Sequence, residues 1–370
     1  MGLLKLGMVG GGQGAFIGGV HRMAARLDGR WELVAGSFSS EPVRAHASAT
    51  EIGVSADRSY GDFREMARVE AMREDGIDAV SIVTPNHLHA PIAQAFLSAG
   101  IHVICDKPMT ATLEQATNLV KVAKSSKASF FLTHNYTGYP MIRQAKKMVT
   151  DGLLGDLRIV QANYLQDWLS EPQGASNKQA AWRTDATQSG AGAIGDIGTH
   201  AYNLASFVTG LRALSVSAGL RSHQANMTVD DDARVALELE NGARGQIWAS
   251  QVAIGNENNL SLEVYGTKAS LRWSQEAANV LIFTEIGKAP QFYTRGGAMT
   301  GPEAAAVTRV PAGHPEGYLE AFATIYREAA DEINGTLSLD RIGLEAGLDG
   351  MKFVDACQRS SRDGSAWVEM

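Results

Sequence analysis

Short apolar segments alternate with helix-length segments over the first third of the chain, and this alternation limits the fold more strongly than any other feature. The apolar segments are rich in Val, Ile and Phe and lack a polar face, which is typical of strands buried on both sides. They are LLKLGMV (3–9), WELVAGS (31–37), IDAVSIV (77–83), IHVICD (101–106) and ASFFLT (128–133). Repeated strand–helix–strand units favour right-handed crossovers, so the pattern predicts a doubly wound parallel sheet of the Rossmann type.

Two local signals support the helices between these strands. Thr112 and Gln115 in TATLEQATNLVKVAK form a capping-box pattern, which predicts a helix start. Gly100, just after PIAQAFLSA, predicts a helix end.

The pattern changes after about residue 150 to a two-residue alternation of apolar and polar side chains. It runs through the segments 155–166, 214–222, 232–253, 259–274 and 279–285. The short connections ENG (240–242) and GTK (266–268) predict hairpins, so we expect a large, mainly antiparallel, open-faced sheet. Helices are predicted at 316–333 and 343–362, and AWVEM can close the chain with a strand.

The two patterns predict two domains, a dinucleotide-binding Rossmann domain at 1–134 and an α+β domain for substrate binding and oligomerisation at 135–370. A chain of 370 residues is long enough for two domains of common size. The C-terminal helices either stay with the second domain or pack back on the first.

Charge and cysteine usage exclude several classes of partner. A net charge of −7, with Lys and Arg scattered, argues against nucleic acid and against an anionic membrane surface. Cys105 and Cys357 are distant in sequence and lack metal-ligand spacing, so we expect neither a disulfide framework nor a metal. No apolar run approaches the roughly 20 residues of a membrane span, and the start does not look like a signal peptide. We expect a protein of the reducing cytoplasm.

The segment GGGQGAFIGGVH (10–21) holds six glycines directly after the first predicted strand. A glycine-rich turn between a first strand and a helix is where a dinucleotide-binding fold receives pyrophosphate. Gly10 and Gly12 fit the first two positions of the fingerprint, whereas either Ala15 or Gly18 can be the third. The expected cofactor contacts in this segment are Gly10, Gly12, Gln13, Gly14, Ala15 and Phe16.

The end of the second strand, AGSFSSEP, carries Phe38 where an acidic residue usually binds the ribose. Without that carboxylate a 2′-phosphate meets less repulsion, and Arg44 is the nearest cation that could meet one. Serines can also bind free ribose hydroxyls, so the choice between NAD and NADP stays open. The expected contacts here are Ser37, Phe38, Ser39 and Arg44.

Two segments follow the third and fourth strands, where ligands of open parallel sheets bind. They are TPNHLHAP (84–91) and CDKPMT (105–110). Lys107 stands between Asp106 and Pro108, whose ring restricts the backbone and so aims the ammonium group. The alternative for such a lysine is an ordinary solvated surface charge.

A third segment, WRTDATQSGAGAIGDIGTHAYNLASFV (182–208), combines glycines with two side chains able to exchange protons. Asp196 and His200 are four residues apart and share one face if the segment is helical. Asp196 and His200 form either a structural pair or a catalytic pair.

These motifs together resemble those of the Gfo/Idh/MocA family of sugar and polyol dehydrogenases. The resemblance runs nearly end to end through the glycine-rich start, TPNHLH, AGIHVICDKP, WR, GAGAIGDIGTH and HPEGYLEAFATIY. DKP stands for the family's commoner EKP, and GAGAIGD for its Gly-triplet form.

The resemblance implies a catalytic triad of Lys107, Asp196 and His200 beneath the nicotinamide of NAD or NADP. Oxidising a secondary alcohol requires a base for the hydroxyl proton and a group that steadies the developing alkoxide. His200 is our choice of base, Lys107 would donate to the same oxygen, and Asp196 would orient the substrate or the base; the first two can exchange roles.

Further contacts are expected around this triad. Pro108 follows a cis peptide bond in some relatives of the family. The expected cofactor contacts beyond the glycine-rich loop are Thr84, Pro85, Asn86, His89, Asp106 and Lys107. The expected substrate contacts are Lys107, Asn135, Tyr136, Trp182, Arg183, Asp196, His200 and His314, of which His314 can equally serve the helix start.

The predicted activity is hydride transfer between a ring hydroxyl of a sugar, polyol or cyclitol and NAD(P). The alternatives are a cofactor-binding, sugar-sensing regulator, and a lyase or glycosidase that uses the dinucleotide transiently. A homodimer or homotetramer is expected through the open face of the large sheet, with Trp248, Leu271 and Trp273 on its strands.

Overall fold

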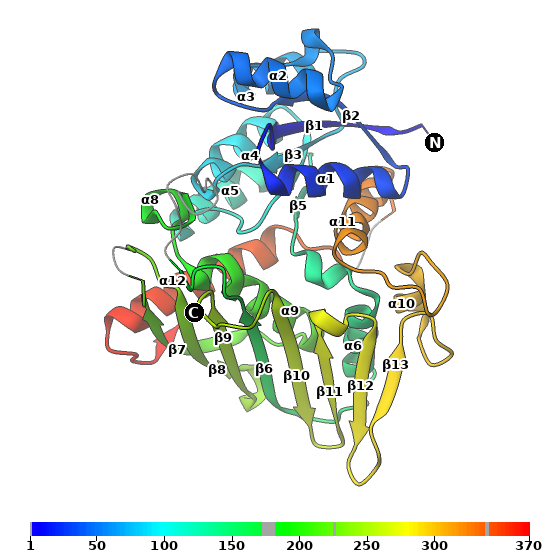
Figure 1. The fold of residues 1–370 in the computed structure, drawn as a ribbon, viewed down its shortest axis with the longest axis vertical. Coiled ribbons are helices and arrows are strands. Elements are labelled where there is room, and N and C mark those ends of the chain that lie inside the picture. The colour runs from blue at the N-terminus through cyan, green and yellow to red at the C-terminus, as the bar shows by residue number, and fades with distance from the viewer. Residues whose placement is uncertain (1, 172–181, 225–226, 337–339) are drawn as a thin grey trace. The chain divides into compact units, whose positions relative to one another are not determined.

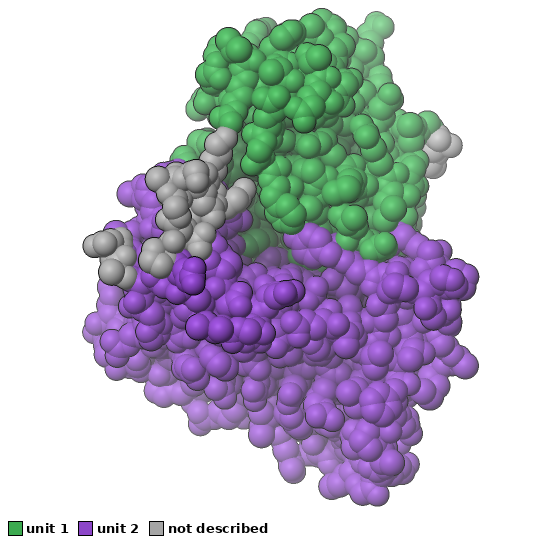
Figure 2. All heavy atoms as spheres, viewed as in Figure 1, with its two compact units in different colours: residues 1–135, 319–348 green, residues 136–318, 349–370 purple. Residues whose placement is uncertain are grey.

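The computed structural model describes residues 2–171, 182–224, 227–336 and 340–370 in two compact units (Figures 1 and 2). The first unit, green in Figure 2, comprises Met1–Asn135 and Leu319–Leu348. The second, purple, comprises Tyr136–Tyr318 and Asp349–Met370.

The first unit contains a five-stranded sheet in which every pair of neighbouring strands is parallel. The strand order β2-β1-β3-β4-β5 changes direction at β1, so the carboxyl ends of β1 and β3 flank the usual binding crevice of such folds. The strands are β1 (Leu4–Gly10), β2 (Trp31–Ser37), β3 (Ala79–Val83), β4 (His102–Cys105) and β5 (Phe130–Leu132). All five predicted strands are confirmed, and so is the doubly wound fold.

The helices of this unit begin and end where the local signals indicate. Thr112 caps α5 by accepting a hydrogen bond from the Gln115 amide at 3.2 Å, and Gly100 follows α4 with φ of +79°. The Gln115 side chain bonds back to the amide of Ala111, one residue before the cap. The helices are α1 (Phe16–Leu27), α2 (Pro42–Ile52), α3 (Phe63–Glu70), α4 (His89–Ser98), α5 (Leu113–Ser125) and α11 (Tyr318–Ile333).

Helix α11 packs on the first unit although the long segment Tyr136–Tyr318 of the second unit precedes it. The indole of Trp31 donates to the backbone carbonyl of Tyr326 at 2.8 Å, and the Tyr326 hydroxyl lies 2.8 Å from Nδ1 of His21. The sequence left open whether the C-terminal helices stay with the second domain or pack on the first, and α11 packs on the first unit.

The second unit contains a nine-stranded sheet of order β13-β12-β11-β10-β6-β9-β8-β7-β14. All neighbours are antiparallel except β6 and β9, which run parallel with Ala162 opposite Ile247. The strands are β6 (Leu157–Leu165), β7 (Ala213–Arg221), β8 (Asp232–Leu239), β9 (Arg244–Ser250), β10 (Asn259–Gly266), β11 (Ala269–Ser274), β12 (Val280–Glu285), β13 (Gln291–Thr294) and β14 (Val368–Glu369). The mainly antiparallel sheet is confirmed, and β13 is a strand that the sequence analysis missed.

One face of this sheet is covered by helices, as Figure 1 shows. They are α6 (Pro140–Thr150), α9 (Thr199–Thr209) and α12 (Leu344–Arg362), whose residues up to Leu348 belong to the first unit. The described residues of the second unit also form the short helices α8 (Ala186–Ser189) and α10 (Pro302–Ala306). Leu271 and Trp273 point to the covered face with exposed fractions of 2% and 4%, so the expectation that they line the open face is wrong. A strand alternates its side chains between faces, and these two share the parity of the buried residues in β11. Trp248 of β9 does lie on the open face, where Arg234 stacks over its ring.

Within the described ranges, none of the helices combines the length and the apolar character required to cross a bilayer.

Candidate active site

The glycine-rich loop after β1 is shaped by contacts that leave no room for side chains. Gly10 has φ of +84°, and a Cβ there would lie 2.7 Å from the carbonyl oxygen of Val83. A Cβ on Gly12 would lie 2.7 Å from both the Phe38 carbonyl oxygen and Oγ of Ser48. Both glycines are therefore required by close backbone approach, as the first two fingerprint positions demand.

The sequence left two residues, Ala15 and Gly18, as candidates for the third position of the fingerprint, and the structure gives them different contacts. Ala15 is the N-cap residue of α1, with an extended backbone. Gly18 lies one turn into the helix, and a Cβ there would come within 2.4 Å of Cα of Gly11. The close packing between helix and loop therefore depends on Gly18.

The amino end of α1 is suited to an anion. In the described structure the N-cap residue makes no side-chain hydrogen bond to the first turn, and that turn holds no acidic residue. Its amide groups and the positive end of the helix dipole are therefore open to a phosphate. Gln13, Gly14 and Phe16 are exposed beside it.

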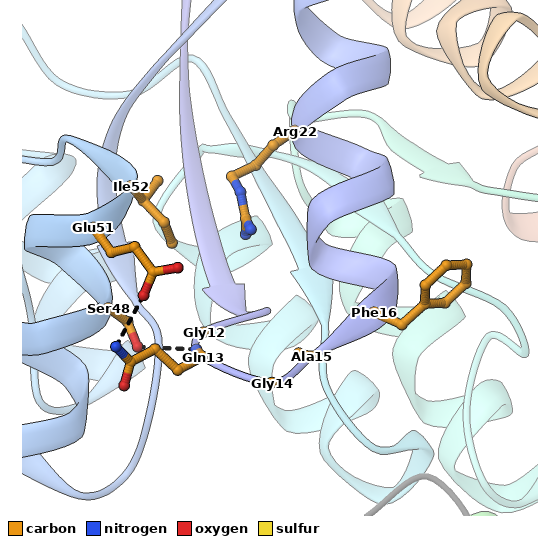
Figure 3. A pocket seen from close by; sticks show the side chains of 9 residues that line it. All are labelled: Gly12, Gln13, Gly14, Ala15, Phe16, Arg22, Ser48, Glu51 and Ile52. Carbon is orange, nitrogen blue, oxygen red and sulfur yellow. Dashed lines mark hydrogen bonds between the residues drawn. The ribbon is translucent and has the colours of Figure 1, made fainter.

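A pocket of about 390 Å³ adjoins this loop (Figure 3). Gln13 spans part of the pocket. Its backbone N–H donates to Oγ of Ser48 at 3.1 Å, and its side-chain NH₂ group donates to the Glu51 carboxylate at 2.9 Å. Arg22 enters from α1 and donates to the carbonyl of Gly11 at 2.7 Å. The lining residues are Gly12, Gln13, Gly14, Ala15, Phe16, Arg22, Ser48, Glu51 and Ile52.

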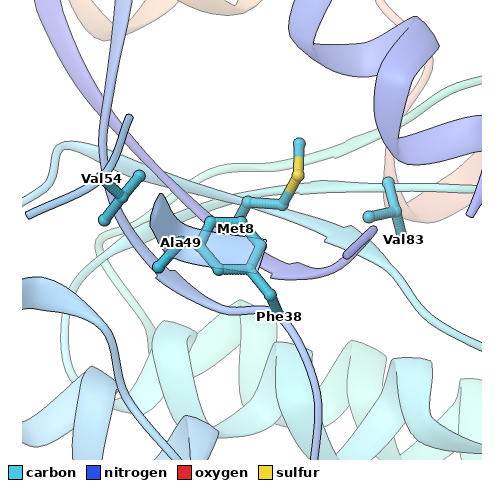
Figure 4. Close-up of a cluster of buried hydrophobic side chains, with 5 residues drawn as sticks. All are labelled: Met8, Phe38, Ala49, Val54 and Val83. Atoms are coloured by element: carbon cyan, nitrogen blue, oxygen red, sulfur yellow. The ribbon is translucent and has the colours of Figure 1, made fainter. Parts of the chain in front are cut away.

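Phe38 does not present its side chain to a ribose. It is 4% exposed and lies in a cluster of buried apolar side chains: Met8, Phe38, Ala49, Val54 and Val83 (Figure 4). Only its backbone can contribute to the site, which corrects the sequence expectation. An apolar ring at this position is worth about 1.5–3 kcal/mol when buried, which explains why it turns inward. Ser37 is also buried, Ser39 accepts a hydrogen bond from the Glu41 amide, and Arg44 is exposed.

His89 lies beneath the loops rather than on their surface. Its side chain is 1% exposed, with Nδ1 2.8 Å from the Pro108 carbonyl oxygen and Nε2 2.9 Å from that of Thr84. Burial lowers the pKa of His89, against the opposing effect of these hydrogen bonds. The His89 ring therefore lies between the segment after β3 and the one after β4, and a contact of His89 with the cofactor stays a prediction.

The segment after β4 holds Lys107, and the Lys107–Pro108 peptide is cis, in agreement with what the resemblance implies. Lys107 is half-buried, and so are Thr84 and Pro85 at the end of β3, whereas Asn86 is 6% exposed. These residues all follow the carboxyl ends of neighbouring strands, as predicted.

Asp106 is anchored from inside the unit. It accepts a hydrogen bond from the Thr133 hydroxyl at 2.8 Å, and Nε2 of the fully buried His21 lies 3.6 Å from its Oδ1. Burial would raise the pKa of Asp106, but the nearby imidazole of His21, the ammonium group of Lys107 and the hydrogen bond from Thr133 outweigh it and lower this pKa. Asp106 is therefore an ionised carboxylate beside Lys107. His21 gave no signal in the sequence, because only the fold brings α1 to this carboxylate.

In the second unit, Asp196 lies in the five-residue π-helix η4 (Ile194–Gly198), which runs directly into α9 with His200 in its first turn. Oδ2 of Asp196 accepts a hydrogen bond from Gln251 at 2.9 Å and lies 3.5 Å from Nε of Arg183. π-Helical turns are rare and frequent at functional sites.

Aromatic and amide side chains surround His200. The rings of Tyr136 and Tyr164 lie 4.9 Å and 6.0 Å from its ring, and their hydroxyls are hydrogen-bonded to each other. Asn258 bonds to both hydroxyls and accepts a further hydrogen bond from Gln166 at 2.8 Å. Burial raises the pKa of Tyr136 and Tyr164, so both phenols stay protonated at neutral pH.

The structure thus brings Tyr136, Arg183, Asp196 and His200 together within the second unit, with Trp182 stacked under the Arg183 guanidinium. Sequence reasoning missed four polar partners, Tyr164, Gln166, Gln251 and Asn258. Their signal was weak, because they stand singly at the ends of β6, β9 and the loop before β10.

The two remaining expected substrate contacts, Asn135 and His314, stay predictions. Asn135 is 1% exposed at the end of the first unit's first segment. His314 has an exposed side chain, and its carbonyl accepts a hydrogen bond from the buried Arg295. The backbone carbonyl of His314 therefore helps to hold the loop before α11 against Arg295.

Comparison with known proteins identifies the family of both parts of the chain. Residues 4–134 match the family model described as oxidoreductase family, NAD-binding Rossmann fold, and residues 142–272 match the GFO/IDH/MocA C-terminal domain. The uncharacterized oxidoreductase YfiI of Bacillus subtilis is 31% identical, with 99% of this chain and 96% of that protein covered.

Solved structures of similar proteins also cover the whole of this chain. An oxidoreductase from Sinorhizobium meliloti is 49% identical with a TM-score of 0.92 and is itself covered to 100%. An inositol dehydrogenase homolog from Azotobacter vinelandii, complexed with NADH and myo-inositol, is 34% identical with a TM-score of 0.93 and is covered to 98%. The chain therefore belongs to the GFO/IDH/MocA family of oxidoreductases, with an NAD-binding Rossmann domain in its first unit.

Proposed function

We propose that the protein oxidises a secondary hydroxyl of a sugar, polyol or cyclitol with NAD. The observation that carries the proposal is the polar cluster around Asp196 and His200, which offers several hydrogen-bond donors and acceptors to a polyhydroxylated ligand. The full-length likeness to an inositol dehydrogenase homolog complexed with NADH and myo-inositol supports the same substrate class.

The first unit fits NAD. Gly10 and Gly12 allow close approach at the loop, and the uncapped amino end of α1 offers amide groups to the pyrophosphate. When bound, the nicotinamide accepts a hydride at its C4 atom. The proposed cofactor contacts are Gly10, Gly12, Gln13, Gly14, Ala15, Phe16, Ser37, Ser39, Arg44, Thr84, Pro85, Asn86, Asp106 and Lys107.

Lys107, Asp196 and His200 are proposed to serve the substrate hydroxyl. His200 accepts its proton, Lys107 donates a hydrogen bond to its oxygen, and Asp196 orients the substrate; the reverse assignment of Lys107 and His200 is the alternative. Asp196 is suited to orientation because Gln251 and Arg183 hold one of its oxygens.

An alanine at Gly12 is expected to raise the dissociation constant of NAD⁺ by about tenfold or more. The added Cβ would stand 2.7 Å from the Phe38 carbonyl, so the loop must move away from its phosphate-binding position. Isothermal titration calorimetry with NAD⁺ measures the change. The matched control is Gly19→Ala, whose Cβ meets only the tip of Arg22 at 3.9 Å and should leave NAD⁺ binding unchanged. Equal effects of the two substitutions would contradict the role of Gly12.

The proposed activity is tested by incubating the purified protein with NAD⁺ or NADP⁺ and a panel of inositols, aldoses and ketoses. We expect an increase in reduced-nicotinamide absorbance with at least one of them, and the comparison of the two cofactors decides the choice between NAD and NADP. A changed sugar without net reduced cofactor would indicate lyase or glycosidase chemistry instead. Binding of cofactor and sugar without any chemical change would indicate a sensor.

The proposed partner of the open sheet face is a second copy of this chain, in a dimer or tetramer. Ile159 is 51% exposed on β6, and Trp248 of β9 lies on the open face. Apolar area of this kind commonly becomes an interface. Analytical ultracentrifugation should show an oligomer, and a strict monomer would contradict it. The two cysteines, both free and buried, support the further proposal of a reducing cytoplasmic setting.

A further inference from the structure

Three consecutive amide groups at the start of the π-helix all donate to one residue, Asp230, to which the proposed chemistry gives no role. The amide of Gly192 donates to Oδ1 of Asp230 at 3.0 Å, and that of Ile194 to its Oδ2 at 2.7 Å. The amide between them, of Ala193, donates to the backbone carbonyl of Asp230 at 2.8 Å. Asp230 therefore caps the helical segment from a distant part of the chain, the residues just before β8.

The contact is too close to be incidental. A Cβ on Gly192 would lie only 1.8 Å from the Asp230 carbonyl oxygen, so the two backbones touch with no side chain between them. Asp230 is 8% exposed, and burial raises its pKa to about 6 against the two hydrogen bonds, which lower it. At neutral pH it is thus mainly a carboxylate, with an acceptor oxygen for each amide.

This anchor leads directly to Asp196. The backbone amide of Asp196 donates to the carbonyl of Gly192 at 2.8 Å. Gly192, which is hydrogen-bonded to Asp230, therefore also begins the turn that carries Asp196. The neighbouring Asp231 acts from the other side, because its backbone carbonyl accepts from the Gln251 amide at 2.8 Å and Gln251 in turn bonds to the Asp196 carboxylate at 2.9 Å.

We propose that Asp230 is a positioning residue, which holds Gly192–Ile194 so that the π-helix presents Asp196 to the substrate. The inference rests on the proposed function for its effect on turnover, but the anchor itself can be tested without it. Displacements of about 1 Å in a reacting group can lower turnover by about 100-fold.

The test compares Asp230→Asn with Asp231→Asn. Asparagine at 230 keeps the size but supplies one acceptor oxygen and an NH₂ group that would face a backbone N–H. We expect kcat for the polyol to fall by about 10- to 100-fold, with the KM for NAD⁺ within about threefold. Asp231 is the matched control, since it is also buried and its carboxylate accepts the amides of His223 and Gln224 instead. The substitution keeps its backbone carbonyl, which is the only atom of Asp231 that the argument connects to Gln251. Its asparagine variant should keep kcat within about threefold.

Hydrogen exchange followed by mass spectrometry supplies a readout besides activity. The amides of Gly192–Ile194 should be strongly protected in the wild-type protein, exchange faster in Asp230→Asn, and keep their protection in Asp231→Asn. Fast exchange of these amides in the wild-type protein would overturn the anchor, even if Asp230→Asn failed to fold. So would unchanged exchange and kcat in a folded Asp230→Asn, or an equal loss of kcat in Asp231→Asn. If no polyol is turned over, the exchange result still decides on the anchor, whereas the proposed function fails separately.

Discussion

Replacing Lys107 with alanine is expected to lower kcat for polyol oxidation by about 1000-fold, with the dissociation constant of NAD⁺ changed by less than about threefold. A positioned proton donor or acceptor typically contributes about 10²- to 10⁴-fold to a rate. The backbone after β4 is fixed in part by His89, whose ring lies between the carbonyls of Pro108 and Thr84 and donates to one of them in its neutral form. The ionised Asp106 keeps a negative charge next to the ammonium group.

Steady-state kinetics with the best substrate of the panel measure this loss, and calorimetry measures NAD⁺ binding. Lys121→Ala is the matched control, since Lys121 is an exposed lysine of α5. It should behave as wild type. Turnover within about threefold of wild type in Lys107→Ala would remove Lys107 from the chemistry.

Glu316→Ala is expected to destabilise the second unit by about 3–5 kcal/mol. Glu316 and Arg295 form an ion pair at 3.0 Å in which both side chains are 2% exposed. Removal of one partner leaves an unpaired buried charge, which accounts for a cost of this size. Glu316 also accepts hydrogen bonds from the backbone amides of Arg309 and Val310 at 2.7 Å and 2.9 Å. The substitution therefore also removes the hydrogen bonds that hold the loop before α11.

Thermal unfolding followed by circular dichroism should show a midpoint lowered by roughly 6–20 °C, as expected for a unit of this size. The control is Glu285→Ala, which breaks an exposed pair with Lys288 and should cost less than about 1 kcal/mol. Equal shifts would show that the Arg295–Glu316 pair is no more important than a surface pair. A larger loss of stability in Glu316→Ala would show that the glutamate of the HPEGY motif stabilises the fold, independently of the role of His314.

The parallel strands, the glycine-rich loop and the order of the motifs could be predicted because their signals are local. A buried strand reads as an apolar run, and a close backbone approach reads as glycine at Gly10 and Gly12. The two-residue alternation likewise predicted most strands of the large sheet. Strand β13 escaped because QFYT is short and only partly buried.

Burial of single side chains was decided by the tertiary structure. The residue at the end of β2 could have faced a ribose, but Phe38 turns into the cluster with Met8 and Val83. His89 stands in a motif beside the cofactor loop, yet its ring is enclosed by two carbonyls. Sequence places a residue on a segment, whereas the direction of its side chain depends on neighbours that other segments supply.

The sequence by itself therefore determined the two kinds of sheet, the phosphate-binding loop and the candidates Lys107, Asp196 and His200. Only the tertiary structure decided that α11 returns to the first unit, that Gln251 holds Asp196, and that Asp230 caps the segment before it. The physical reason is separation along the chain. Periodicity and turn chemistry act between residues a few positions apart, whereas these contacts join residues 36 to 305 positions apart and exist only after the chain has folded.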